Sequence, residues 1–198
     1  KTYEHNFKRK NPLLFDLSES GVNNFGADIK GLDGKKIPDF DLIAAGFPCQ
    51  PFSHAGYKKG FADPRGTLFG DIVRLIDEKG PKRRPVALFL ENVSHFKKHD
   101  SGLTFATVEK ELRKRGYTFD ASIVRASEFG LPQHRPRLFM TSFDTRNRGY
   151  RFDKEFHFDF DAIPRPKKRK TMSNIFGAPC QREIGFTLRV GGRSSGVH

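Results

Sequence analysis

Three short apolar runs, each bordered by polar residues, restrict most strongly how this chain can fold. The first run, at 42–45, leads directly into the octapeptide GFPCQPFS at 46–53. The second closes on the tripeptide ENV at 91–93, and the third begins just after QHRPR at 133–137. Short apolar runs of this kind are typical of buried strands. Because strand ends of an α/β sheet share one rim, the pattern predicts an active site at that rim.

The position of Cys49 favours a reactive thiol. Proline fixes φ and cannot donate to a strand ladder, so Pro48 must end its strand and leave Cys49 on a stiff turn. Such a turn suits a nucleophile. Free cysteines are often inert buried side chains, however, and the octapeptide alone admits that interpretation. Since Cys180 is the only other cysteine, neither a disulfide framework nor a cysteine-based zinc site is indicated, and no metal site is expected.

The hydrophobic pattern predicts an α/β fold. Helices are predicted at 67–79, stopped by Gly80 and Pro81, and at 104–115, ended by Gly116. Strands are predicted at 37–46, 85–90, 117–124 and 137–142. Alternation of strands and helices implies a mostly parallel sheet that is covered on both faces.

The character of the sequence changes after about residue 145, which divides the chain into two regions, 1–145 and 146–198. In the second region four phenylalanines between 152 and 160 alternate with charged residues, and the basic run PRPKKRK follows at 164–170. The aromatic alternation predicts an edge strand packed on the core, with a stacking platform as the alternative. The basic run is either a phosphate contact or a solvated linker.

The charge of the chain favours a polyanionic partner. Lysine and arginine number 36 against 23 acidic residues, for a net charge of +13. Such a balance predicts salt-sensitive binding, although a ribosomal or membrane-surface protein would share it. No apolar run approaches the ~20 residues of a membrane-spanning helix, so no membrane partner is expected. The low cysteine content suits the reducing cytoplasm.

The motifs GFPCQPFS, ENV and QHRPR, in this order and spacing, resemble the signature motifs of cytosine-C5 DNA methyltransferases. Residues 56–69 are similar to the mobile catalytic loop of that family and the helix after it. Residues 187–193 resemble the start of its target recognition domain. The resemblance implies a Rossmann-like S-adenosylmethionine-dependent methyltransferase sheet, truncated at its N-terminus, in 1–145. It also implies a linker and the incomplete start of a target recognition domain in 146–198.

The resemblance implies methyl transfer from S-adenosylmethionine to C5 of a cytosine flipped out of duplex DNA. In that reaction Cys49 adds to C6 of the base, and Glu91 donates a hydrogen bond to N3. Arg137 contacts O2, and Arg135 braces the loop. Only a protonated carboxyl can donate, and a buried strand end beside 88–90 favours that neutral form. Neighbouring arginines favour a thiolate at the nucleophile.

The resemblance also assigns binding residues. Those expected to contact the cofactor are Asp28, Ile29, Pro48 and Leu68. Those expected to contact DNA are Gln50, Ser53, Thr187 and Arg193.

The family's glycine-rich first motif and its last two motifs have no counterpart in this sequence, which begins at Lys1. We therefore expect an internal piece of a longer enzyme of a bacterial restriction–modification system, cytoplasmic and monomeric when complete. The alternative is a natural split that another chain completes. The piece by itself is expected to bind the cofactor weakly or not at all and to be inactive. Two other functions stay open: a tRNA cytosine-5 methyltransferase, and a catalytically inactive nucleic-acid-binding remnant.

Overall fold

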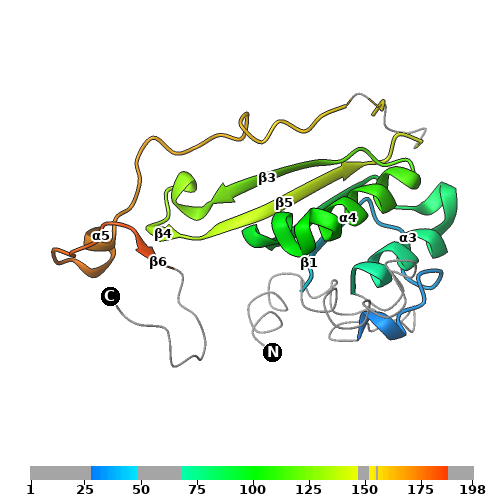
Figure 1. Cartoon of the computed structure of the whole chain (residues 1–198), viewed down its shortest axis with the longest axis horizontal. Helices are drawn as coiled ribbons and strands as arrows, with labels where there is room; N and C mark the ends of the chain where they lie inside the picture. The colour runs from blue at the N-terminus through cyan, green and yellow to red at the C-terminus, as the bar shows by residue number, and fades with distance from the viewer. Residues whose placement is uncertain (1–27, 49–67, 147–151, 155, 187–198) are drawn as a thin grey trace.

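The computed structural model describes residues 28–48, 68–146, 152–154 and 156–186 (Figure 1). Within these residues no helix combines the length and the apolar character needed to cross a membrane. The elements, with η for 3-10 helices, are η3 (Ile29–Gly31), β1 (Leu42–Gly46), α3 (Leu68–Arg83), β2 (Ala87–Val93), η5 (Ser94–Gly102), α4 (Leu103–Lys114), β3 (Asp120–Arg125), η6 (Ala126–Phe129), β4 (Gln133–His134), β5 (Pro136–Phe143), α5 (Met172–Phe176) and β6 (Gly185–Phe186).

The main sheet has the strand order β1-β2-β5-β3. β1 pairs with β2 in parallel, whereas β5 runs antiparallel to both β2 and β3. Three of the four strands therefore share one direction, and the prediction of a mostly parallel sheet is wrong for β5. The physical reason is the short connection at 126–135, because a parallel crossover requires about a dozen residues or more.

The reversal of β5 places its beginning beside the carboxyl end of β2. Gly46 of β1 lies opposite Glu91, which in turn lies opposite Phe139 of β5. Arg137 lies opposite Val93 at the end of β2. The described residues of the three motifs therefore meet at one rim of the sheet. In an all-parallel sheet the residues that precede β5 would lie at the opposite rim.

The main hydrophobic core lies between the sheet and the helices α3 and α4. Leu88 and Leu90 of β2, with Leu138 and Met140 of β5, are at most 1% exposed and belong to one cluster with residues of both helices. Each such side chain contributes roughly 1.5–3 kcal/mol by leaving water. The core therefore fixes which face of each strand points toward the helices, and the alternate residues point to the other face.

The second face of the sheet is partly covered by an extended segment at 152–163, which runs along β3 and β5 in Figure 1. The ring of Phe143 packs against those of Phe152, Phe156 and Phe158, with centroids 4.8, 4.9 and 6.1 Å away. The predicted edge strand is wrong, because the described part of this segment forms no strand. The backbone N–H of Phe158 donates instead to the Asp120 carboxylate at 2.9 Å, and the segment packs through its rings.

Element boundaries also differ from the sequence prediction. β1 begins at Leu42 instead of residue 37, because the buried ammonium of Lys79 donates to the carbonyls of Ile37 and Pro38. α3 extends to Arg83, although its backbone leaves the helical region at Gly80 (φ 71°), where the sequence predicts the stop. The carbonyls of Ile37 and Pro38 therefore accept hydrogen bonds from the Lys79 side chain instead of from a neighbouring strand.

Candidate active site at the rim of the sheet

Glu91 and Arg137 form an ion pair across β2 and β5. The Nε atom of Arg137 lies 2.8 Å from Oε1 of Glu91, and the two side chains are 19% and 36% exposed respectively. They occupy diagonal positions on the same face of neighbouring strands, where long side chains reach one another. Two of the three groups that the sequence predicts to converge are therefore in contact.

The environment of Glu91 differs from the buried setting expected from residues 88–90. Leu88 and Leu90 point toward the helices, whereas Glu91 points to the opposite face of the strand. Its carboxylate is partly exposed and forms an ion pair with the guanidinium of Arg137. The apolar neighbours in the sequence therefore describe the other face of β2.

Gly46 leaves the space that Glu91 occupies. A Cβ atom at residue 46 would lie 3.2 Å from Oε2 of Glu91, which is tighter than ordinary van der Waals contact. Because the two residues are cross-strand partners, a larger residue on β1 would press directly on the carboxylate. The glycine of the GFPCQPFS motif thus has a steric role beside the ion pair.

The chain leaves β1 through a firmly held residue, Phe47. Its ring packs against Phe69 and, edge-on, against Phe96, with centroids 5.6 Å away in each case. Its carbonyl accepts a hydrogen bond from the side chain of Asn92 at 2.8 Å. Asn92 is a site residue that the motifs did not indicate, although its alternation with Leu88 and Leu90 is a signal that its amide points into the core.

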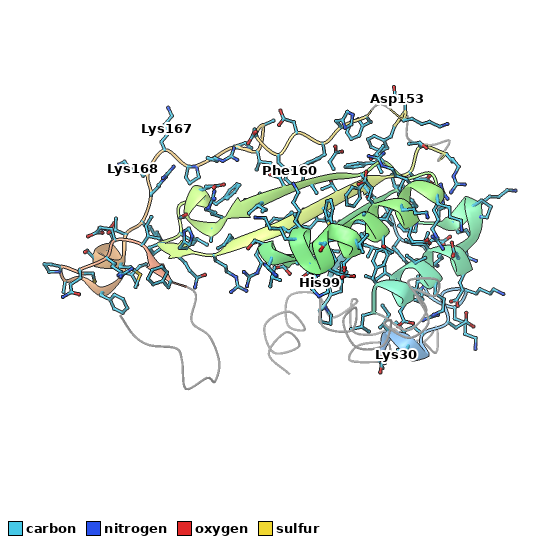
Figure 2. The ribbon with its side chains drawn as sticks, in the orientation of Figure 1. Lys30, His99, Asp153, Phe160, Lys167 and Lys168 are labelled. Atoms are coloured by element: carbon cyan, nitrogen blue, oxygen red, sulfur yellow. The ribbon has the colours of Figure 1, made fainter. Side chains whose placement is uncertain are left out.

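A pocket of about 340 Å³ opens beside the ion pair. Its charged lining residues are Glu91, Arg125, Arg135 and Arg137. The rest of the lining is aromatic and aliphatic and includes the stacked pair Phe89 and Phe139 (centroids 5.2 Å apart). Phe160, labelled in Figure 2, adds a wall from the extended segment. This size and lining suit a small organic ligand.

Arg135 reaches the rim by a different route from Arg137. Its side chain is exposed and lines the pocket, and its carbonyl accepts from the backbone N–H of Ala126 at 3.3 Å. That bond ties the residue before β5 to the start of η6. The two arginines therefore line the same pocket and differ in exposure, since Arg135 is exposed and Arg137 is half-buried.

The residues expected to hold the cofactor lie around the N-terminal half of α3. Leu68 begins that helix and, like Ile29, packs against the core cluster. The guanidinium of Arg74 donates to the Ile29 carbonyl at 2.7 Å and so binds η3 to α3. The carboxylate of Asp28 caps η3 through the N–H of Lys30. Pro48 is exposed directly after Phe47.

The remaining expected residues lie outside the described part of the chain. They are Cys49, Gln50, Ser53, Thr187 and Arg193. Their roles stay predictions.

The sequence model of the C-5 cytosine-specific DNA methylase family matches residues 1–189. The chain therefore belongs to this family, and its mixed α/β sheet is a Rossmann-like methyltransferase fold. Both statements confirm what the three motifs indicated.

Relatives of known name support this assignment. The type II methyltransferase M.HhaI of Haemophilus parahaemolyticus is 42% identical over 142 residues, which cover 69% of this chain and 42% of the relative. M1.ScrFI of Lactococcus lactis subsp. cremoris is 43% identical over 152 residues, 75% of this chain and 36% of the relative. The chain thus spans less than half the length of these relatives.

Solved structures share the fold. A Spodoptera frugiperda DNMT2 mutant superposes with a TM-score of 0.55 at 18% identity, covering 81% of this chain and 50% of the other. The S. pombe Dnmt2 methyltransferase gives a TM-score of 0.51 at 22% identity, covering 77% and 48%. At this level of identity the likeness concerns the fold.

Proposed function

We propose that this chain carries the catalytic rim of a DNA (cytosine-5-)-methyltransferase of a bacterial restriction–modification system. The observation that carries the proposal is the contact of Glu91 with Arg137 at the strand rim from which the chain leads on to Cys49. The relatives that match at 42% and 43% identity bear the name type II methyltransferase. Region 146–198 would begin the part that recognises the DNA target.

Each group at the rim has a role in the proposed reaction. Cys49 adds as a thiolate to C6 of the flipped cytosine, which makes C5 electron-rich enough to take a methyl group. The C5 proton then passes to a base from solvent, and the C6–S bond breaks to release the thiolate. Glu91 donates a proton in a hydrogen bond to N3, and Arg137 binds O2. In the present arrangement these two side chains satisfy each other. An entering base therefore replaces one contact by two: Arg137 turns to O2, and Glu91 takes a proton from solvent and turns to N3.

The residues around η3 and α3 fit the adenosine part of S-adenosylmethionine. A carboxylate has acceptor sites for several donors, so Asp28 can cap η3 and still accept from an amine or hydroxyl of the cofactor. Ile29, Leu68 and Pro48 offer apolar surface to a planar ring, and the Arg74 bond holds Ile29 in place. When bound, S-adenosylmethionine supplies an electrophilic methyl group.

Duplex DNA is the proposed partner, and the basic run is its proposed phosphate contact. Residues 164–170 are all exposed, and the backbone N–H of Lys170 donates to the Gly130 carbonyl at 3.0 Å. In Figure 2 Lys167 and Lys168 lie on the chain between the extended segment and α5, and the side chain of Lys167 points away from the sheet. Exposed lysines that point outward can neutralise phosphates and release counterions. The whole enzyme is proposed to be a monomer. The alternative is a natural split in which another chain supplies the missing motifs.

Covalent trapping tests this function. Duplex DNA that carries 5-fluorocytosine, incubated with S-adenosylmethionine and the whole enzyme that contains this piece, should form an adduct that survives denaturing electrophoresis, because fluorine cannot leave C5 as a proton does. Cys49→Ala should abolish the adduct, and Cys180→Ser should retain it as a matched thiol control. An adduct that persists in Cys49→Ala removes Cys49 from its role. A tRNA substituted in the same way, trapped in place of the duplex, would redirect the proposal to RNA.

A further inference from the structure

We propose that Asn92 is a positioning residue for the nucleophile Cys49, an inference that rests on the proposed function of Cys49. Asn92 is 3% exposed. Its Nδ2 donates to the Phe47 carbonyl at 2.8 Å, and its Oδ1 accepts from the Val93 N–H at 2.9 Å. One buried side chain thus joins the end of β2 to the chain that leaves β1.

The location of this amide is unusual for a core position. Asn92 follows Leu88 and Leu90 on the helix-covered face of β2, where an apolar side chain would pack without any hydrogen-bonding requirement. A buried amide is costly unless its polar atoms are paired. Both partners of Asn92 are backbone groups at the rim, so the gain from placing an amide here is control of the backbone at that point.

The Phe47 carbonyl is the group that needs such control. The parallel ladder between β1 and β2 ends with the pair Gly46 and Glu91, so Phe47 lies one residue beyond it. The Asn92 side chain donates a hydrogen bond to the first carbonyl beyond the end of the ladder, that of Phe47. Phe47 is therefore held by three contacts: the hydrogen bond from Asn92 to its carbonyl and the packing of its ring against Phe69 and Phe96.

A fixed Phe47 matters because Cys49 follows only two residues later. Pro48 stands between them, and its ring restricts φ. The position of the thiol therefore depends on few free torsions once Phe47 is held. Displacing a reacting group by ~1 Å can cost a hundredfold in rate. Since Asn92 directly follows Glu91 on β2, one strand both presents the proposed acid and holds the chain that presents the nucleophile.

Thiol alkylation in the full chain tests the positioning role. In a Cys180→Ser background Cys49 is the single thiol, and its rate of reaction with iodoacetamide is measured across pH. Asn92→Ala removes the side chain. Asn92→Asp keeps its shape and its acceptor but replaces the amide donor to Phe47. Ser142→Ala is the matched control, because Ser142 is 1% exposed and its hydroxyl has no hydrogen-bond partner in the described part of the chain.

Both Asn92 variants are expected to lose about tenfold in alkylation rate at neutral pH, with a changed pH profile, while Ser142→Ala stays within about twofold of the parent. Rates of both variants within about twofold of the parent, or above it, overturn the proposal. Thermal melts accompany every variant. If Asn92→Ala is unfolded under assay conditions, Asn92→Asp decides; unfolding of both overturns the proposal by making Asn92 a folding residue.

The failure of the underlying function is recognised separately. Fluorocytosine trapping is measured on the whole enzyme that contains the parent sequence, and its absence there contradicts methyl transfer. The alkylation rates report on the link between Asn92 and Cys49 in either case.

Discussion

Replacing Asp144 by alanine should destabilise the chain by about 3–5 kcal/mol, the usual cost of leaving one partner of a buried ion pair alone. Asp144 is 0% exposed and Arg84 is 6% exposed. Nε of Arg84 donates to Oδ2 of Asp144 at 2.6 Å, and Nη2 donates to Oδ1. Without the carboxylate, the buried guanidinium keeps the Arg115 carbonyl at 2.7 Å and the face of Tyr117 as neighbours. Neither neighbour carries a compensating negative charge.

Thermal melts and urea titrations measure the effect. For a chain of this size the loss corresponds to a fall in Tm of about 6–20 °C. The double variant Arg84→Met with Asp144→Leu removes both charges and should recover most of the stability, because well-packed apolar residues often replace a buried pair without loss. Asp161→Ala is the control, since its partner Arg165 is 31% exposed and Asp161 itself 95% exposed, and such surface pairs contribute about 0–1 kcal/mol.

Two results would refute this reasoning. The first is an Asp144→Ala variant that is no less stable than Asp161→Ala. The second is a double variant as unstable as Asp144→Ala, which would show that lost packing, and not the uncompensated charge of Arg84, sets the cost.

Two further predictions concern the rim and the loop before β1. Gly46→Ala should slow fluorocytosine trapping several-fold while Tm changes little, because the new methyl group displaces the Glu91 carboxylate. The displacement is a fraction of the ~1 Å that can lower a reaction rate a hundredfold. An unchanged trapping rate would contradict the steric role. Hydrogen bonds from Arg83 and then Lys79 lower the pKa of Asp39 below its ordinary 3.8, so its contribution to stability is present above 3.8 and is lost as the pH falls through the lowered value. Asp39→Asn should therefore be less stable than the parent at neutral pH and equal to it in strong acid, as melts across pH would show.

The location of the site could be predicted from sequence because it depends on strand ends. The apolar runs fix where β1, β2 and β5 lie, and GFPCQPFS, ENV and QHRPR fix what stands beside them. The direction of β5 could not be obtained from periodicity, since a strand has the same alternation read either way. Only the length of the connection at 126–135 contains that information.

The environment of individual side chains was harder to predict. The apolar neighbours of Glu91 in the sequence suggested that it is buried, but alternate residues of a strand point to opposite faces. Its partner Arg137 lies 46 positions further along the chain (137 minus 91), so no local pattern indicates the ion pair. The bond from Asn92 to Phe47 is equally non-local. The pairing of β4 with β6 joins residues 133–134 to 185–186. Strands of two residues are too short for a hydrophobic pattern to predict them.

The antiparallel ladder of β2 and β5 links the far ion pair to the rim. Arg84 lies just before β2 and Asp144 just after β5, while Glu91 and Arg137 stand near the other end of the same two strands. Seven cross-strand pairs join them, from Ala87 with Phe143 to Val93 with Arg137. A slip of one residue would turn every side chain of β5 to the opposite face, which would carry Arg137 away from Glu91 and Leu138 out of the core. The buried pair at one end therefore stabilises the single register in which the candidate active site exists at the other.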